Sequence, residues 1–358
     1  MGATYKNNIE LTIFGESHGK AIGITIGNLP SGIQIDLDEV ARDMKRRAPG
    51  QNKMSTARKE ADQVEILSGL QDGITTGAPL TGVIYNSDQH SKDYSLLKTN
   101  MRPGHSDYPA YIKYKGFNDV RGGGHFSGRI TAPIVFAGNI AKQILKQKGI
   151  VVGAHILSIG NVKDERFPYN VDETLLSSLS QKHYPTIKED VFEKMEATIL
   201  KAKENLDSVG GKVECVALHV PAGIGEPFFD SLESHLSSLM FSIPAVKSVS
   251  FGDGEMIDQM LGSEANDCYY YDENGDVKTS SNHNGGITGG ITNGMPVSCT
   301  VTFKPTPSIA KKQKTINVET KENVELEIKG RHDPCIVQRA VVVVEAMMAL
   351  GILDMMGE

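Results

Sequence analysis

The stretch NIELTIFGESHGKAIGITIG, residues 8–27, carries apolar side chains at alternate positions on both sides of a central turn. Alternation with a period of two is typical of β-strands, and the glycines around residues 16–18 suit a tight hairpin. The next segment, DLDEVARDMKRR at 36–47, has the apolar spacing of a helix and an aspartate placed to cap it. The chain is therefore predicted to open with a strand, a turn, a strand and a helix.

The same turn contains a Gly-x-Ser-x-Gly motif, with Ser17 at its centre and His18 beside it. A serine hydrolase places this nucleophile between a strand and a helix, above strands that precede it in the chain. Here the serine stands between the first two strands, so the pattern argues against a nucleophile. It predicts instead that Ser17 and His18 project from a rigid sheet edge.

A later segment repeats the strand-to-helix pattern. Residues 29–47 and 220–240 each follow a strand end with Pro-x-Gly-Ile and then a helix, which predicts duplicated units packed about a pseudo-twofold axis. No low-complexity linker divides the chain, so we expect a single domain over 1–358, with the polar stretch 161–190 as a surface excursion. Further helices are predicted at 131–149, 191–205 and 335–353, and further strands at 149–160 and 210–223.

Composition limits the function classes. The chain has 358 residues, 39% of them hydrophobic, and a net charge of -7, which disfavours a nucleic-acid binder driven by bulk phosphate attraction. No apolar run approaches ~18 residues and the first residues lack a signal core, so a cytoplasmic location is expected. Without C-x-x-C spacing, the cysteines are predicted to be reduced core thiols: Cys215, Cys268, Cys299 and Cys335.

Basic side chains are concentrated in residues 42–59, where seven lysines and arginines stand against one aspartate. One interpretation is a solvated helix face. The other is that Pro49 and Gly50 end the helix directly after Arg47, so that its last turn and the following loop direct several cations inward. The second interpretation suits a polyanionic small molecule. Nucleic acid is disfavoured because no aromatic residues are interleaved with the charge.

Two loops combine glycines with basic and titratable side chains. The segment RPGHSDY at 102–108 holds Arg102, His105 and Asp107, although a lone loop histidine is often solvent-exposed and idle. The segment RGGGHFSGRIT at 121–131 sets three glycines ahead of a helix. Such a run is unfavourable unless the backbone turns sharply or something approaches it closely. The helix N-terminus behind it is a candidate anion site, of neither the P-loop nor the dinucleotide type.

Glycines recur in SNHNGGITGGITNGMP at 281–296, ahead of a strand that ends in KPTPS at 304–308. Their density favours a flat ligand lying against bare backbone, although glycines in strands often mark only bulges. Further on, Asp333 precedes a proline that can begin the terminal helix. Asp333 is then either the N-cap of that helix or a positioned base beside Arg331 and His332.

The residues alone indicate an enzyme that binds a phosphorylated or polycarboxylate substrate, together with a phosphate-bearing flat cofactor. No histidine or cysteine pair has zinc spacing, and the pattern names no reaction. Two other classes compete with this interpretation. One is a non-catalytic polyanion binder built on residues 42–59. The other is a metal hydrolase built from His18, His105, His283 or His332 with Asp107 or Asp333.

Ten motifs occur in the order in which the chorismate synthase family has them, so the chain resembles that family over nearly its whole length. They are GESHG, RRAPGQ, RKEADQVEILSGLQDGITTGAPL, NSDQHSKDY, RPGHSDY, RGGGHFSGRITA, SIPAVKSVSFGDG, SNHNGGITGGITNGMP, KPTPS and RHDPC. The resemblance implies an α+β fold, a β-α-β sandwich with internal pseudo-twofold strand-helix units, and assembly as a homotetramer.

The resemblance implies a lyase of the shikimate pathway, which leads to the aromatic amino acids. Its reaction is the anti-1,4-elimination of phosphate from 5-enolpyruvylshikimate 3-phosphate to give chorismate. Reduced FMN is required without net redox change, because the flavin lends electron density and recovers it. The chain lacks the insertions of the longer fungal type. An external flavin reductase or other reductant is therefore expected, with NADPH only an indirect source of electrons.

The resemblance also assigns roles by matched motif. His18 would protonate the departing phosphate, His105 would hold the reduced flavin in its protonation state, and Asp333 would act as base. Substrate contacts would come from Ser17, Arg46, Arg47, Lys53, Arg102, Arg129 and Arg331. Flavin contacts would come from His125, Phe126, Ser127, Pro244, Ala245, Gly289, Lys304, Pro305, Thr306, Pro307, Ser308 and Arg331. At position 53 and position 125 the family more often has arginine, and at position 244 asparagine is common.

Overall fold

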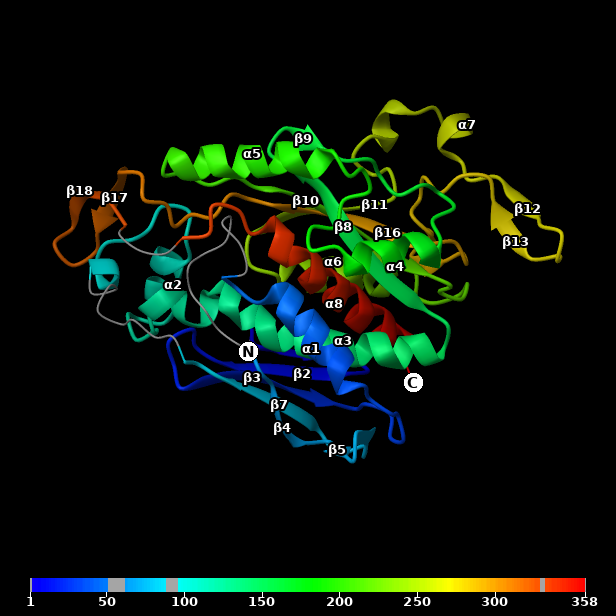
Figure 1. Cartoon of the computed structure of the whole chain (residues 1–358), viewed down its shortest axis with the longest axis horizontal. Coiled ribbons are helices and arrows are strands. Elements are labelled where there is room, and N and C mark those ends of the chain that lie inside the picture. The colour runs from blue at the N-terminus through cyan, green and yellow to red at the C-terminus, as the bar shows by residue number, and fades with distance from the viewer. Residues whose placement is uncertain (1, 51–61, 88–95, 329–331, 358) are drawn as a thin grey trace.

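The computed structural model describes residues 2–50, 62–87, 96–328 and 332–357. Two five-stranded antiparallel sheets enclose a layer of helices, and two more helices cover the outer face of the second sheet (Figure 1). This arrangement is the predicted sandwich of sheet, helix and sheet, extended by one outer helical layer.

The first sheet has the order β1-β2-β3-β7-β4. Its strands are β1 (Thr4–Lys6), β2 (Glu10–Gly15), β3 (Ala21–Gly27), β7 (Leu80–Tyr85) and β4 (Glu65–Ser68). The β2–β3 hairpin pairs Glu10 with Gly27 and Gly15 with Ile22, which confirms the strand, turn and strand predicted around Ser17. Asp36 caps the following helix as predicted, because its side chain accepts from the backbone N–H groups of Asp38 and Glu39.

The second sheet repeats the connectivity of the first. Its order is β11-β16-β10-β8-β9, with strands β11 (Val246–Phe251), β16 (Val297–Phe303), β10 (Gly211–Leu218), β8 (Val151–Ile159) and β9 (Val162–Lys163). Each repeat contributes four strands. The first strand of a repeat is paired with the second, and the fourth lies between the second and the third. The two orders are β2-β3-β7-β4 and β8-β10-β16-β11.

The helices obey the same repetition. Each second strand leads to a shorter helix, α1 (Leu37–Arg47) or α6 (Leu232–Phe241). Each fourth strand precedes a long helix, α3 (Thr131–Gln147) or α8 (Val337–Met356). The pseudo-twofold duplication predicted from residues 29–47 and 220–240 is therefore confirmed at the level of topology.

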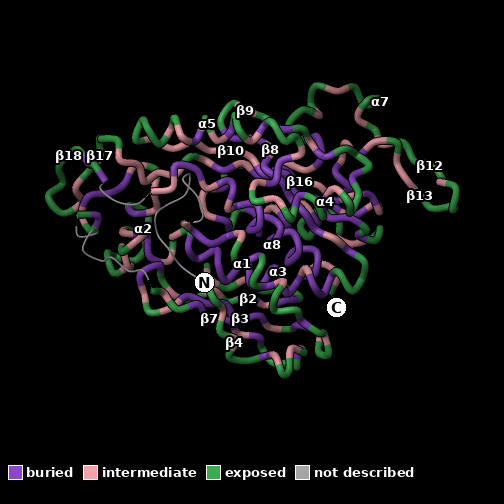
Figure 2. Tube along the Cα trace, in the orientation of Figure 1, coloured by how far each residue is buried: buried purple, intermediate pink, exposed green. Residues whose placement is uncertain are grey.

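The core is centred on α3 and α8, which lie side by side between the sheets and are buried along almost their whole length (Figure 2). Successive residues of β10 face opposite ways. Cys215 and Ala217 join the central core, whereas Val216 and Leu218 pack under α4 (Glu173–Gln181). With α5 (Val191–Glu204), α4 covers the outer face of this sheet. The stretch 161–190 is thus more than the predicted surface excursion.

The cysteines lie only partly where the sequence predicts them. Cys268 is exposed, whereas the other three are buried, and all four are free. The prediction that all four lie in the core is therefore wrong for Cys268. Among the described residues no helix has both the length and the hydropathy needed to cross a membrane.

Smaller elements complete the described part of the chain. They are α2 (Asp107–Lys113), α7 (Gly262–Ala265), β5 (Leu70–Gln71), β6 (Ile74–Thr75), β12 (Tyr269–Tyr271), β13 (Val277–Thr279), β14 (Ile287–Thr288), β15 (Ile291–Thr292), β17 (Gln313–Asn317) and β18 (Glu322–Leu326).

The contact between α3 and α8 depends on Gly138. A Cβ at this position would lie 2.1 Å from the Cβ of Ala346, so the helices would have to separate. We expect Gly138→Ala to destabilise the fold by about 1–3 kcal/mol despite the better helix propensity of alanine. Thermal unfolding measures the effect. Gly262→Ala, which adds its methyl group to open space in α7, is the control and should leave the midpoint unchanged.

Candidate functional site

A cavity of about 910 Å³ lies beside the first sheet and the middle helices. Its wall combines the β2–β3 turn, the end of α1, the loops ahead of α2 and α3, the segment around Lys304 and the segment from His332 into α8. Both repeats thus contribute to it. A second hollow of about 580 Å³ lies on the α4 side of the second sheet, but Arg166 and Tyr169 in its wall are already bonded to carboxylates of the protein. The larger cavity is the candidate site.

Ser17 and His18 lie at the tip of the β2–β3 hairpin and line the cavity, with 1% and 5% of their surface exposed. The hairpin is tied to the glycine loop, because the Ser17 backbone N–H donates to the carbonyl of Gly124 over 3.1 Å. The loop passes so close that a Cβ on Gly122 would lie 2.3 Å from Cε1 and Nδ1 of His18. The hairpin therefore presents His18 from a rigid, crowded position.

The three consecutive glycines bring protein groups together. All three have positive φ, which favours glycine. A Cβ on Gly123 would lie 3.4 Å from the ring of His105, and one on Gly124 would lie 2.0 Å from the carbonyl oxygen of Asp119. The sequence predicts that something approaches these glycines closely, and the structure shows His18, His105 and the backbone of Asp119 in that position. An anion is not needed to explain the three glycines.

Gly122→Ala tests this packing. The methyl group would collide with the His18 ring at a position whose φ of +59° already strains an L-residue, so the histidine has to move. A displacement of about 1 Å at a reacting group can cost about 10²-fold in rate, and we expect a loss of turnover of that order. Steady-state kinetics measure it. Gly32→Ala shares the left-handed φ, but its methyl group meets open space; this control should retain full activity.

Arg47 and Arg129 meet at the buried carboxylate of Asp62. Arg47 Nη2 donates to Oδ2 over 2.9 Å, and Arg129 Nη1 donates to Oδ1 over 2.6 Å. Burial alone would raise the pKa of Asp62, but the two guanidinium groups outweigh it and hold the pKa below its usual value. Burial lowers the pKa of Arg47 to about 10, with Arg339 and Arg129 acting in the same direction. The sequence analysis did not single out Asp62, although the motif that begins at Arg58 contains it, because its partners Arg47 and Arg129 are distant in the chain.

Arg102, His105 and Asp107 form a second cluster. Arg102 makes a bidentate pair with the Asp107 carboxylate, at 2.7 Å from Nε and 2.8 Å from Nη2, and its Nη1 donates to Ser308 Oγ over 3.0 Å. His105 Nδ1 lies 2.7 Å from Asp107 Oδ1. The predicted loop thus holds its histidine against an ion pair at the cavity wall, and the histidine is not idle in solvent.

Asp333 is not the N-cap of the last helix, which corrects one of the two predicted roles. The helix begins at Val337, with Ile336 as its cap residue, so Pro334 precedes it by a full turn. The Asp333 carboxylate lines the cavity and accepts from Arg339 Nη1 over 2.8 Å. Arg339 Nε also donates to the carbonyl of Arg47 over 2.9 Å. Arg339 was missed because it stands in an apolar helical run that reads as core.

Most residues matched to flavin contacts line this cavity. One ring nitrogen of His125 has a structural role, because Nδ1 lies 2.8 Å from the carbonyl oxygen of Gly15. Ser127 caps the turn ahead of α3, its side chain accepting from the Arg129 backbone N–H. The matched residues in the wall are His125, Phe126, Ser127, Pro244, Ala245, Lys304, Thr306, Pro307 and Ser308.

Pro305 and Gly289 are not in the wall. Gly289 lies in the turn between β14 and β15, where an added Cβ would meet nothing within 4 Å. Its neighbours Gly286 and Gly290 are needed for packing, since a Cβ there would lie 2.5 Å from the Pro296 carbonyl oxygen or 2.4 Å from that of Glu226. The glycine density at 281–296 therefore has a structural cause, and a flavin contact at Gly289 stays a prediction.

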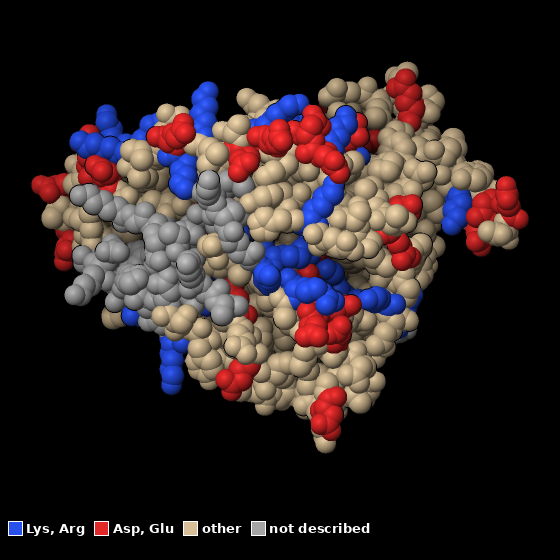
Figure 3. Space-filling view, in the orientation of Figure 1, with Lys and Arg blue, Asp and Glu red and all other residues tan. Residues whose placement is uncertain are grey.

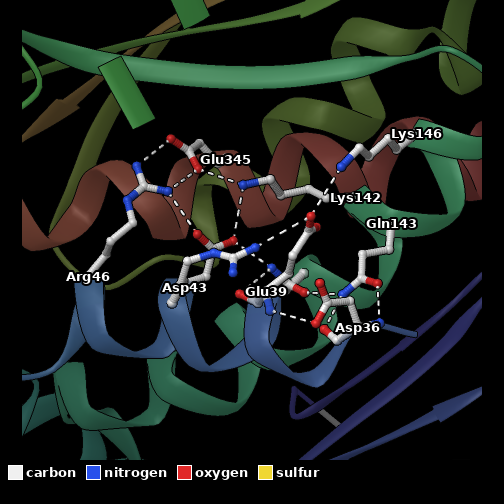
Figure 4. Close-up of polar contacts among 10 residues, drawn as sticks. Asp36, Glu39, Asp43, Arg46, Lys142, Gln143, Lys146 and Glu345 are labelled. Carbon is white, nitrogen blue, oxygen red and sulfur yellow. Dashed lines mark hydrogen bonds and ion pairs between the residues drawn. The ribbon is translucent and has the colours of Figure 1, made fainter. Parts of the chain in front are cut away.

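Arg46 points away from the cavity. Figure 3 shows basic and acidic side chains mixed across the middle of one face, and Figure 4 resolves such a cluster between α1, α3 and α8. Arg46 makes a bidentate pair with Glu345, both bonds 2.7 Å, and a third bond to Asp43; Lys142 bridges the same two carboxylates. Its charge is neutralised within the protein, so the prediction that Arg46 contacts substrate is not supported. The basic segment is accordingly less cationic than its sequence suggests.

Two predicted residues, Lys53 and Arg331, lie outside the described part of the chain. His283 is bonded to Asp253 over 2.7 Å and does not line the cavity, so it is separated from His18, His105 and His332. Within the described ranges, no group of three metal-ligating side chains gathers.

Comparisons with known proteins agree with this geometry. The chorismate synthase family model matches residues 9–356. A chorismate synthase of Thermococcus gammatolerans is 47% identical over 97% of this chain and 95% of its own length. One of Methanocaldococcus jannaschii is 45% identical over 99% and 96%. A crystal structure titled as a chorismate synthase superposes with a TM-score of 0.76 at 27% identity, covering 97% of this chain and 91% of the other.

The match at 9–356 extends over both repeats and over the cavity-lining segments from β2 to α8. It is carried by sequence as well as by shape, and the relatives are covered almost end to end. The chain therefore belongs to the chorismate synthase family, whose members are lyases of aromatic amino acid biosynthesis.

Proposed function

We propose that this chain catalyses the anti-1,4-elimination of phosphate from 5-enolpyruvylshikimate 3-phosphate, giving chorismate, with reduced FMN as cofactor. One observation carries the proposal beyond family membership. The cavity gathers His18, His105 and Asp333, the three residues to which the resemblance gives chemical roles, although they lie far apart in the sequence.

The charge of the cavity wall supports a substrate with two carboxylates and a phosphate. Among the described residues, the guanidinium groups of Arg47, Arg129 and Arg339 pair with the carboxylates of Asp62 and Asp333. The pair of Arg102 with Asp107 is neutral, and Lys304 adds a further cation. This concentration of cationic side chains, in a chain of net charge -7, favours a polyanionic ligand at this place.

The wall also fits a flavin. Lys304, Ser308 and Ser127 provide cationic and hydroxyl groups for a phosphate, while Ala245 and Pro307 provide apolar surface for a flat ring. Ala245 has a φ of +76°, and its carbonyl accepts from the Lys304 backbone N–H, which fixes this part of the wall. Lys304, Ser308 and Ser127 would hold the phosphate of reduced FMN, which would supply electron density for the loss of phosphate from the substrate without net redox change.

The chain's own residues move the protons. His18 is the proposed proton donor to the leaving phosphate, held by the hairpin and the glycine loop at the cavity wall. Asp333 is the proposed proton acceptor, oriented by Arg339. His105 is proposed to set the protonation state of the cofactor, and Arg47, Arg102 and Arg129 to neutralise the substrate. Arg46 is left out of this set for the reason given above.

The wider setting follows from the same resemblance. We propose that residues 1–358 act as one domain, that four copies associate, and that the enzyme works in the cytoplasm. A separate reductant, such as a flavin reductase drawing on NADPH, would keep FMN reduced.

The test is an anaerobic reaction of the purified chain with chemically reduced FMN and 5-enolpyruvylshikimate 3-phosphate. We expect stoichiometric release of phosphate and chorismate while the flavin spectrum stays that of the reduced form. Oxidised FMN should give no turnover. If phosphate is released equally well with oxidised FMN, or if the flavin is consumed in proportion to product, the proposal is wrong.

A further inference from the structure

The carboxylate of Asp107 has all of its hydrogen-bonding positions filled. Oδ2 accepts from the backbone N–H of Arg102 at 3.1 Å and from Arg102 Nε at 2.7 Å. Oδ1 faces Arg102 Nη2 at 2.8 Å and His105 Nδ1 at 2.7 Å. An ionised carboxylate only accepts, with about four lone-pair positions. Asp107 therefore has no proton to give, and His105 Nδ1 has to carry the hydrogen between them.

The surroundings keep this carboxylate ionised and this histidine neutral. Burial would raise the pKa of Asp107, but hydrogen bonds from Arg102 and His105 outweigh it and hold the pKa well below the usual range. Burial lowers the pKa of His105, and Arg102 and Lys304 act in the same direction; Asp107 opposes them through its hydrogen bond and its charge. Among the described residues, the charged groups that act on the ring are Arg102 from the same loop, Asp107 at the start of α2 and Lys304 directly after β16.

The other ring nitrogen, Nε2, is left as an acceptor. A neutral imidazole with a hydrogen on Nδ1 has a lone pair on Nε2. His105 lines the cavity, and a Cβ on Gly123 would lie 3.4 Å from Nε2, so the glycine keeps a side chain away from this nitrogen. Within the described residues Nε2 has no hydrogen bond. It is a fixed acceptor in a wall that also holds the cationic donors Arg47, Arg129 and Lys304.

We infer that Asp107 is a positioning residue, which holds His105 as the Nδ1–H tautomer so that Nε2 receives a hydrogen bond from an N–H or O–H group of the bound ligand. The inference rests on the proposed function only in taking this cavity as the active site. The family motifs contain Asp107 without a stated role. The inference gives it one: Asp107 selects which of the two ring nitrogens of His105 carries the hydrogen.

The first experiment needs no variant. Protein labelled with ¹⁵N-histidine is studied by solid-state NMR near neutral pH, with the His105 signals assigned from their loss in His105→Gln. We expect Nδ1 to show the shift and proton coupling of an N–H nitrogen and Nε2 those of an unprotonated one. The reverse pattern overturns the inference, whether or not the protein proves to be active.

The second experiment changes the carboxylate. In Asp107→Asn the side-chain amide can donate to Nδ1, so we expect the proton to move to Nε2 and turnover with reduced FMN to fall at least about 100-fold, as when a buried aspartate behind a catalytic histidine is replaced. Asp107→Glu should restore part of the loss. Retained Nδ1–H with normal turnover in Asp107→Asn overturns the inference.

The chain supplies a matched control. Asp253 stands between Arg166 and His283, with His283 Nδ1 at 2.7 Å, in the same order of arginine, carboxylate and histidine but outside the cavity wall. Asp253→Asn should alter the His283 signals and leave turnover per folded molecule unchanged. A comparable loss of turnover in this control would show that the effect at Asp107 is general destabilisation, which also overturns the inference. If wild-type and variant spectra are as expected but the wild type releases no phosphate, the proposed function fails and the tautomer assignment stands.

Discussion

Replacement of His18 by glutamine is expected to lower kcat by about 10²–10⁴-fold, the usual contribution of a positioned acid or base. Glutamine keeps much of the volume and hydrogen-bonding ability of the ring, so it should still fit between the hairpin and Gly122. It cannot deliver a proton to the leaving phosphate. We therefore expect KM and the affinity for reduced FMN to change little, because the loss falls on the chemical step.

Single-turnover phosphate release under anaerobic conditions, with flavin binding measured in parallel, checks this expectation. Ser17→Ala is the neighbouring control: the side chain beside His18 is shortened, and we expect only a modest loss through weaker positioning. Near wild-type phosphate release in His18→Gln would remove the histidine from the mechanism. A covalent adduct on Ser17 during turnover would instead support the hydrolase interpretation, which is disfavoured because Ser17 lies between two strands.

Asp333→Asn is expected to cost at least about 10²-fold in kcat. The amide oxygen can still accept from Arg339, so Arg339 should also keep its hydrogen bond to the carbonyl of Arg47 at the end of α1. What is lost is the ability to take up a proton. Removal of the substrate hydrogen should then limit the rate, and the kinetic isotope effect on a substrate deuterated at that hydrogen should increase.

The control is Asp119→Asn. Asp119 is also paired with an arginine, Arg121, but this pair is more exposed and does not line the cavity. An exposed pair contributes little, and this variant should behave as wild type. An unchanged isotope effect and rate in Asp333→Asn would show that the proton is accepted elsewhere.

Much of the fold could be read from local pattern. Alternation in residues 8–27 and the capped helix at 36–47 fixed the first hairpin and α1, because short-range periodicity decides which face is buried. The echo at 220–240 correctly indicated two repeats. The order of strands within each sheet was not readable, since β7 and β16 insert between strands that precede them in the chain, and such pairing depends on long-range contacts.

The site was partly predictable. His18, His105 and Asp333 could be singled out because glycine and proline mark loops that carry function. All three line the cavity, and their chemical roles stay predictions. Arg46 was indistinguishable from Arg47 by sequence, yet successive residues of a helix point about 100° apart, and only Arg47 faces the cavity. Asp62 and Arg339 were missed because their importance comes from partners distant in the chain.

The position of α8 between the sheets bears on how the protein is made. This helix follows both sheets in chain order, yet it fills the space between them. During translation the surfaces that α8 covers, which lie on α3 and on β8 and β10 of the second sheet, stay exposed until α8 leaves the ribosome. Nascent chains at that stage expose large apolar surfaces and are open to self-association. Ribosome-bound chains that stop before residue 337 should therefore be strong clients for chaperones, and release of the finished helix should end that dependence.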